Sequence, residues 1–172
     1  GANLILINNF LTKSNMYKKI FAFDTYEGQP DPSEKDFDIK GTKMIEKFEV
    51  LKKKNVTPVF CSLENVKKNI LNYSENDLEK IIFVKGKVEE TLRSEKNLPN
   101  KISLLRLDTD FYDSIKISLE ILYPRLCKGG VLIIDDYGHF KGAQTAVDDF
   151  FNNKKNIWMH RVDYTCRLII KP

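Results

Sequence analysis

Short apolar runs alternate along this chain with segments whose apolar residues recur at helical spacing. The runs are continuous and rich in Ile, Leu, Val or Phe, as expected of strands buried on both faces. They cover residues 19–24, 81–84, 102–107 and 131–134. Helical spacing occurs in residues 42–54, 62–72, 114–126 and 142–151. Alternating strands and helices predict a parallel sheet with helices on both of its faces.

The two ends of the chain complete this plan. Residues 3–11 are apolar enough for a buried helix or a strand, and periodicity alone does not distinguish the two. Residues 157–162 and 166–170 have the pattern of two strands joined by a short turn. A length of 172 residues with 42% hydrophobic residues suits one domain with one core. We therefore predict a single domain over residues 1–172, with an α/β fold whose doubly wound, mostly parallel sheet has an antiparallel C-terminal edge.

Charge and cysteine usage argue against several classes of function. The 28 basic residues are interleaved with 24 acidic ones and the net charge is only +4, so no nucleic-acid footprint is indicated. Cys61, Cys127 and Cys166 lie far apart and form no C-x-x-C pair, which argues against a disulfide framework and a zinc site. No apolar stretch approaches the roughly 18 residues of a membrane span, and no leader pattern is seen. These features predict a soluble, cytoplasmic protein that binds neither nucleic acid nor membrane.

Two pairs of aspartates follow two consecutive predicted strands. Asp108 and Asp110 end one strand, and Asp135 and Asp136 end the next, with one helical segment between them. A right-handed crossover puts both strand ends on one edge of the sheet, where ligands of such folds bind. Four carboxylates repel one another there unless a cation or raised pKa values relieve the repulsion. Oxygen ligands without nearby His or Cys favour a hard divalent cation, with Mg²⁺ as the first choice.

Asp24 is a separate signal, at the end of the predicted strand 19–24. A carboxylate there can accept hydrogen bonds from the two ribose hydroxyls of a nucleotide-like cofactor. An Asx turn or a loop cap before Gly28 explains the residue equally well. The aspartate pairs have a structural alternative too, because Asp113 could cap the following helix and Asp110 could stabilise its first turn.

Several motifs along this chain occur together in a fixed arrangement. The central block is specific, because two aspartate pairs, a Tyr-Pro after a helix and a Gly-Gly before a strand occur in one order at one spacing. The matching segments are Phe23–Gly28, Phe83–Gly86, Leu105–Ser114, Leu122–Leu126, Gly129–Gly130, Ile133–Gly138 and Gly142–Phe150. Together they span nearly the whole chain, and they resemble the macrocin O-methyltransferase family.

The resemblance implies a Rossmann-like class I methyltransferase that uses S-adenosylmethionine and Mg²⁺ to methylate a sugar hydroxyl of a small natural product or glycan. By position, Asp108, Asp135 and Asp136 match metal ligands. Asp110 matches the general base or a further ligand, and the resemblance leaves the division of work between Asp108 and Asp110 open. The positions that match donor contacts are Gly1, Asp24, Thr25, Lys85 and Gly86.

The start of the chain departs from the family. There a first strand at the centre of the sheet and a glycine-containing turn precede the first helix, whereas this sequence begins as though Gly1 were the last glycine of that turn. We therefore expect an N-terminally truncated fold, and a catalytically silent methyltransferase-like module or fragment stays open as an alternative. A glycosyltransferase is a further alternative, since Asp108-Thr-Asp110 fits a D-x-D motif. The sequence is also compatible with a homo-oligomer.

Overall fold

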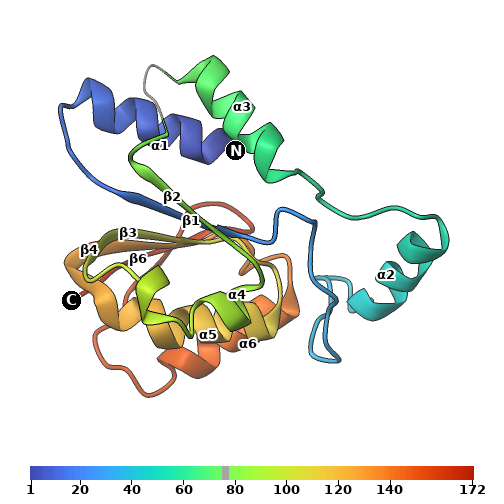
Figure 1. Ribbon diagram of the computed structural model, residues 1–172. Helices are drawn as coiled ribbons and strands as arrows, with labels where there is room; N and C mark the ends of the chain where they lie inside the picture. The colour runs from blue at the N-terminus through green and yellow to red at the C-terminus, as the bar shows by residue number, and fades with distance from the viewer. Residues whose placement is uncertain (75–77) are drawn as a thin grey trace. The chain divides into compact units, whose positions relative to one another are not determined.

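The chain divides into two compact units in the computed structural model, which describes residues 1–74 and 78–172 (Figure 1). Unit 1 consists of Gly1–Gln29 and Thr57–Lys87, and unit 2 consists of Pro30–Val56 and Val88–Pro172. Each unit contains a parallel strand pair together with helices. That residues 1–172 form a single domain stays a prediction.

Unit 1 is built around a two-stranded parallel sheet. Its elements are α1 (Ala2–Lys13), β1 (Ile20–Asp24), α3 (Leu63–Tyr73) and β2 (Ile81–Lys85). The strands pair in register from Ile20 opposite Ile81 to Asp24 opposite Lys85. Leu11 of α1 and Ile70 of α3 are buried in the same core as the strand residues. The apolar segment 3–11, which the sequence left open between helix and strand, therefore belongs to helix α1.

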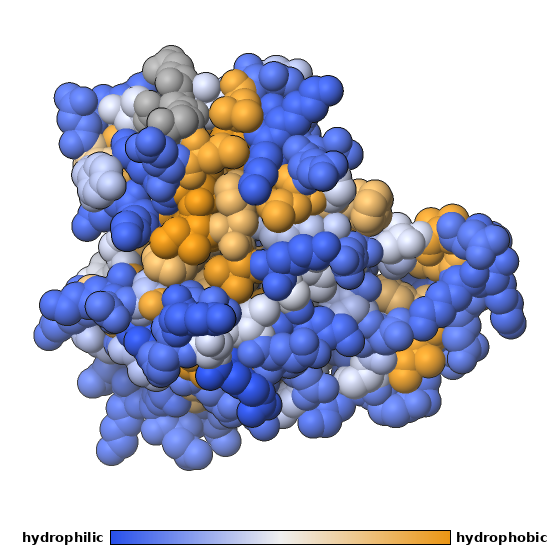
Figure 2. Space-filling model, viewed as in Figure 1, coloured by the Kyte–Doolittle hydropathy of each residue, from blue (hydrophilic) through white to orange (hydrophobic). Residues whose placement is uncertain are grey.

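Unit 1 leaves apolar side chains on its surface. Leu6 and Phe10 of α1 are 68% and 60% exposed, and Leu71 of α3 is 56% exposed. Figure 2 shows a band of apolar residues on unit 1, whereas hydrophilic residues cover most of the visible helices of unit 2. Two strands bury too little apolar surface to form an extensive core. Of the helices that the structure describes, none combines the length and the apolarity needed to cross a membrane.

Unit 2 is built on a four-stranded sheet of order β3-β4-β6-β5. Its strands are β3 (Ile102–Leu107), β4 (Leu126–Ile134), β5 (Met159–Arg161) and β6 (Arg167–Ile170). Its helices are α2 (Met44–Lys53), α4 (Val88–Thr91), α5 (Tyr112–Leu122) and α6 (Lys141–Phe151), with 3-10 helices η1 (Glu95–Asn97) and η2 (Tyr123–Arg125). β3 and β4 are parallel, and β6 and β5 follow in antiparallel pairing. The prediction of an α/β fold with parallel pairs and an antiparallel C-terminal edge is confirmed.

The core of unit 2 lies on one face of this sheet. Successive strand residues point to opposite faces, and the set on the covered face is almost inaccessible to solvent. This set comprises Leu105, Leu107, Leu132, Ile134 and Ile169. Ile115 and Leu119 of α5 are fully buried, because their spacing puts them on one side of the helix. α5 and α6 lie on the same side of the sheet in Figure 1.

Two element boundaries differ from the prediction for local reasons. The helix expected to reach Leu126 ends at Leu122, because Pro124 lacks an N–H group and its ring clashes with the preceding turn. The following strand begins at Leu126 rather than Val131. Gly129 lies inside it with a φ of +74°, near a register shift in the partner strand that accommodates the irregular backbone.

The strands are distributed over two sheets, whereas the alternation of elements predicted one. Among the described residues, no strand of the β1-β2 sheet is paired with a strand of the four-stranded sheet. Each parallel pair is therefore completed by its own helices.

The one-sided packing of unit 2 gives a first prediction. Leu105→Ala should lower the free energy of unfolding by about 2–5 kcal/mol, because it leaves a cavity beneath α5. Leu104, the preceding residue, points to the other face and is 44% exposed. Leu104→Ala should therefore cost less than about 1 kcal/mol. Urea unfolding followed by circular dichroism measures both, and equal losses would contradict burial on one face only.

Candidate functional site

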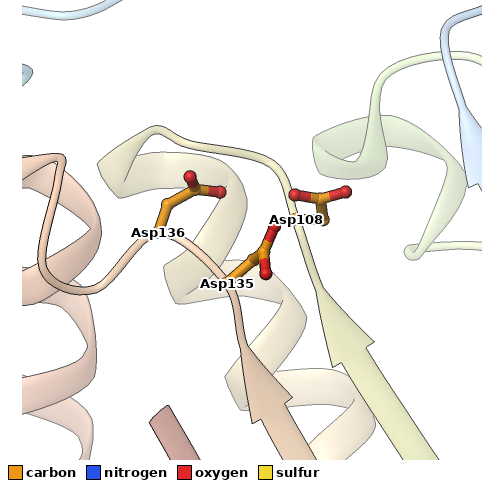
Figure 3. Close-up of side chains that lie close together, drawn as sticks. All are labelled: Asp108, Asp135 and Asp136. Atoms are coloured by element: carbon orange, nitrogen blue, oxygen red, sulfur yellow. The ribbon is translucent and has the colours of Figure 1, made fainter. Parts of the chain in front are cut away.

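The aspartates predicted to form a site lie at the carboxyl ends of β3 and β4. The last residues of the two strands, Leu107 and Ile134, are register partners, and the Asp135 N–H donates to the Leu107 carbonyl at 3.0 Å. Asp108 and Asp135 therefore leave the sheet at the same level. One carboxylate oxygen each from Asp108, Asp135 and Asp136 lies within 4.8 Å of the other two. Figure 3 shows the three side chains beyond the strand ends.

Asp110 occupies a tight turn after β3. Its φ of +63° is left-handed, a conformation that Asp adopts more readily than most residues. The Phe111 N–H donates to the Thr109 carbonyl at 2.7 Å, and the Ser114 hydroxyl donates to the same carbonyl at 3.1 Å. Asp110 does not belong to the three-carboxylate set and instead shares a hydrogen bond with Asp136. Both residues of one strand-end pair thus contact the other pair, Asp108 through Asp135 and Asp110 through Asp136.

A distant buried carboxylate fixes the start of α5 behind this turn. Asp36 is 2% exposed and accepts a hydrogen bond from the Tyr112 N–H at 2.8 Å, 76 residues along the chain. A Cβ atom at Gly142 of α6 would lie 2.1 Å from the Asp36 Oδ1 atom, so only glycine leaves room for this cap. Asp113 lies inside the first turn of α5 and is not its N-cap. The structural alternative that the sequence offered for Asp113 is therefore wrong.

Burial and mutual repulsion raise the pKa values of two of the clustered aspartates. Burial is the main cause for Asp136, and its hydrogen bond with Asp110 adds to it, so the pKa rises to about 9. Burial and a hydrogen bond with Asp108 raise the pKa of Asp135 to about 6, against the opposing charge of Arg106. At neutral pH the cluster without a cation therefore retains a proton, most strongly on Asp136.

Arg106 contacts this cluster most directly, although the sequence analysis did not single it out. Its Nη1 donates to Asp108 Oδ2, and its Nη2 donates to Asp135 Oδ2 at 2.8 Å. The signal was present in the sequence. Side chains two residues apart on a strand share a face, so Arg106 on β3 is placed to reach an acid at position 108.

The donor atoms of the cluster fit a hard divalent cation. The buried Oδ2 atom of Asp136 has no hydrogen-bond partner among the described residues. A buried carboxylate oxygen without a partner is costly unless a proton or a cation compensates it. Three carboxylates without a nitrogen or sulfur ligand suit Mg²⁺, Mn²⁺ or Ca²⁺. Asp108, Asp135 and Asp136 are the residues that could hold such an ion.

The residues matched to donor contacts belong to unit 1, and most of them meet at one strand end. Asp24 and Lys85 are register partners, and the Gly86 N–H donates to the Asp24 carbonyl at 3.0 Å. The Asp24 Oδ1 atom accepts a hydrogen bond from the Tyr26 N–H at 2.7 Å. This is the Asx turn that the sequence offered as the alternative reading of Asp24.

The other polar groups at this strand end are also engaged. The Thr25 hydroxyl donates to the Gly28 carbonyl at 2.5 Å, and the Lys85 ammonium pairs with Glu27 at 2.7 Å. Gly1 lies at the start of α1, where its carbonyl accepts a hydrogen bond from the Ile5 N–H at 3.1 Å. The structure thus brings Asp24, Thr25, Lys85 and Gly86 together, and it places Gly1 at a helix terminus.

An α/β fold with acids at the ends of its parallel strands is the plan of Rossmann-like methyltransferases. The solved structure of the O-methyltransferase NovP matches this chain with a TM-score of 0.79 and 25% identity, covering 97% of this chain and 66% of NovP. The calicheamicin methyltransferase CalS11 matches with a TM-score of 0.62 at 17% identity, over 97% of this chain and 65% of CalS11, and shares the fold.

The chain belongs to the Macrocin-O-methyltransferase (TylF) family, whose model matches residues 1–170. It is 29% identical to the demethyldecarbamoylnovobiocin O-methyltransferase of Streptomyces niveus, over 87% of this chain and 54% of that enzyme. It is also 29% identical to the 8-demethyl-8-(2,3-dimethoxy-alpha-L-rhamnosyl)-tetracenomycin-C 4'-O-methyltransferase of Streptomyces olivaceus, over 77% of this chain and 47% of that enzyme. The chain spans about half the length of these curated relatives. The family resemblance inferred from the sequence is confirmed.

The raised pKa values predict how stability depends on pH without a cation. Protonated Asp135 and Asp136 contribute stability that is fully present below the pKa of an unfolded Asp, about 3.9. This stability is lost as the pH rises through the folded pKa values, about 6 for Asp135 and about 9 for Asp136. Asp136→Asn removes the loss of stability that accompanies the ionisation of Asp136. In EDTA between pH 7 and 10, the free energy of unfolding should therefore fall less steeply with pH in Asp136→Asn than in the wild type. The two slopes should differ by at most about 1.4 kcal/mol per pH unit, and urea unfolding measures both.

Asp31→Asn is the matched control for this measurement, because Asp31 forms an exposed ion pair with Lys52 in the same unit. That variant should keep the decline of the wild-type protein. A decline as steep in Asp136→Asn as in the wild type would show that Asp136 does not retain a proton in the folded state.

Proposed function

We propose that this chain carries catalytic residues of an S-adenosylmethionine-dependent, Mg²⁺-dependent O-methyltransferase that acts on a sugar hydroxyl of a natural product or glycan. The observation that supports it most is the cluster of Asp108, Asp135 and Asp136, with its buried unpartnered oxygen, in a member of the macrocin family. An alcohol is a poor nucleophile at neutral pH. A divalent cation held by these carboxylates would supply the charge that lowers the pKa of the hydroxyl.

The proposed sugar acceptor follows from a relative and from the loop beyond Asp136. The name of the Streptomyces olivaceus enzyme specifies methylation on a rhamnosyl derivative of tetracenomycin. In this chain, His139 Nδ1 and the Tyr164 hydroxyl lie 2.9 Å apart, next to the acidic strand end. Tyr164 is 55% exposed. A polar aromatic pair of this kind suits the alternating apolar and hydroxyl surfaces of a sugar.

The proposed donor contacts use the strand end of unit 1. Because the Asp24 Oδ1 atom is engaged by Tyr26, we assign the Oδ2 atom to the ribose hydroxyls of the donor. Gly86 has a φ of +136°, which favours glycine and keeps the backbone beside Asp24 free of a side chain. Lys85, its ion partner Glu27 and Thr25 then border the nucleoside.

The geometry supports a division of work between the two aspartates after β3. Asp108 belongs to the three-carboxylate set, so we assign it to cation binding. Asp110 lies outside that set and shares a hydrogen bond with Asp136, so we assign it as the general base. Once Asp136 has lost its proton, Asp110 can accept the proton of the acceptor hydroxyl, directly or through one water. The remaining task is to hold the oxygen in line with the methyl group.

The test combines binding with turnover. S-adenosylmethionine is titrated calorimetrically, Mn²⁺ is titrated by electron paramagnetic resonance, and labelled methyl transfer is assayed on a panel of 6-deoxyhexosides with Mg²⁺. Saturable donor binding that Asp24→Asn weakens, together with Mg²⁺-dependent transfer, is expected. Binding without transfer to any glycoside would favour a catalytically silent module. Transfer from a sugar nucleotide would favour the D-x-D glycosyltransferase.

Asp135→Asn should weaken Mn²⁺ binding by at least about tenfold, because even contacts outside the metal ligands are commonly worth that much. Asp31→Asn, which removes an equal charge from an exposed ion pair in the same unit, should leave the affinity unchanged. Electron paramagnetic resonance titration at one pH measures both variants. Equal affinities for Mn²⁺ in Asp135→Asn and the wild type would exclude this cluster as the cation site.

Asp110→Asn should lower kcat by about 10²–10⁴, the usual contribution of general base catalysis. Its Mn²⁺ affinity should change far less than that of Asp135→Asn, because Asp110 lies outside the three-carboxylate set. Initial rates at saturating donor and cation, together with the Mn²⁺ titration, separate the two effects. A loss of cation affinity as large as in Asp135→Asn would make Asp110 a ligand instead.

A further inference from the structure

One guanidinium group bridges the two strand ends of the acidic cluster. Arg106 lies on β3 and contacts Asp108 at the end of its own strand through Nη1. Through Nη2 it contacts Asp135 at the end of β4, at 2.8 Å. The Arg106 side chain is 26% exposed, so both ion pairs are partly shielded from water. Two parallel strands are thus joined by a charged contact beyond their last backbone pair.

The contacts use only part of the cluster. Both run to Oδ2 atoms, and a hydrogen bond also links the side chains of Asp108 and Asp135. The buried Oδ2 atom of Asp136 also has no hydrogen-bond partner among the described residues. A cation held by Asp108, Asp135 and Asp136 would use carboxylates that the guanidinium also contacts. The two positive charges would then share the same pair of aspartates.

We propose that Arg106 is the internal counter-ion of the metal-free cluster: it holds Asp108 and Asp135 together in the absence of a divalent cation and lowers the affinity of the cluster for that cation. The inference rests on the proposed cation site. Arg106 is a positioning residue in this scheme, since it acts through the two carboxylates and not on the acceptor.

The charge of Arg106 has two opposing effects on cation binding. Because Arg106 already orders the two carboxylates, they lose less side-chain entropy when a cation binds, which favours binding. By lying next to the same carboxylates it repels the dication, and repulsion at this short range in a partly buried site is the larger effect. Removing the charge should therefore tighten cation binding while it destabilises the metal-free protein. Damage to the fold alone would weaken both.

The shape of the side chain matters as well as its charge. A guanidinium presents donors in a fixed fork that can reach two carboxylates at once, whereas a lysine ammonium acts as a point charge. Arg106→Lys should therefore retain most of the repulsion and lose part of the bridge. Arg106→Gln removes the charge and keeps a polar side chain. Comparing the two variants therefore separates the effect of the charge of Arg106 from the effect of its shape.

The experiment measures two quantities in the same variants: Mn²⁺ affinity by electron paramagnetic resonance, and urea unfolding in EDTA at pH 8. Arg106→Gln should bind Mn²⁺ about tenfold more tightly, equivalent to about 1.4 kcal/mol, and should unfold in EDTA at a lower urea concentration than the wild type. Arg106→Lys should bind Mn²⁺ as the wild type does and show an intermediate midpoint.

Arg125→Gln is the matched control. Arg125 has a side-chain exposure of 24% and forms an ion pair with Glu95 in the same unit, through two contacts of 3.0 and 2.9 Å. Loss of this pair should leave Mn²⁺ affinity unchanged. A double-mutant cycle tests the bridge itself. In EDTA, Asp135→Asn should lower the free energy of unfolding less in the Arg106→Gln variant than in the wild type, because the two residues belong to one ion pair.

Three results would overturn the inference. Weaker Mn²⁺ binding by Arg106→Gln would make Arg106 an aid to the cation, and unchanged unfolding in EDTA would exclude a counter-ion role. Additive effects of the Arg106 and Asp135 substitutions would exclude the bridge. Absence of Mn²⁺ binding by the wild type would instead refute the proposed cation, and the unfolding data in EDTA would still decide whether Arg106 is the counter-ion of the cluster.

Discussion

The parallel pairing of β3 with β4 is the constraint on which the acidic cluster depends. It sets Leu107 opposite Ile134, so that the residues after them emerge side by side. The pairing is held in register by the fully buried Ile134 on one side and by α5 beneath it. A slip of one residue would turn every buried strand residue to the open face. Apolar packing therefore fixes the level at which Asp108 and Asp135 leave the sheet, and Arg106 then bridges their side chains.

The same arrangement recurs in unit 1 with different chemistry. The parallel pair of β1 and β2 ends in Asp24 opposite Lys85, a pair of opposite charges, whereas β3 and β4 end in carboxylates. Opposite charges can remain close in water at little cost, so this strand end needs no cation. Like charges require one or must retain protons. Two strand ends of one topology thus differ in charge, one mixed and the other acidic.

Much of the fold could be predicted because its signals are local. The apolar run 102–107 is observed as β3 without change, since a strand buried in a parallel pair reads as a continuous apolar segment. The cap of α5 could not be predicted, because Asp36 reaches it from 76 residues away and only folding brings them together. Arg106 was missed for a different reason. Its spacing to Asp108 is visible in the sequence, but a single arginine between Leu105 and Leu107 in an apolar run does not by itself indicate a contact with Asp135.

Arg106 compensates only part of the charge of the acidic cluster. The guanidinium satisfies one oxygen each of Asp108 and Asp135, and it lowers the pKa that burial raises in Asp135. The Oδ2 atom of Asp136 is buried and lacks a hydrogen-bond partner among the described residues, and the pKa of Asp136 is about 9. A proton can neutralise that carboxylate, but a proton shared with Asp110 would keep Asp110 from acting as the proposed base. Under the proposed function, a divalent cation held by Asp108, Asp135 and Asp136 would remove this conflict, because it would stabilise the charge on Asp136 and leave Asp110 able to accept a proton.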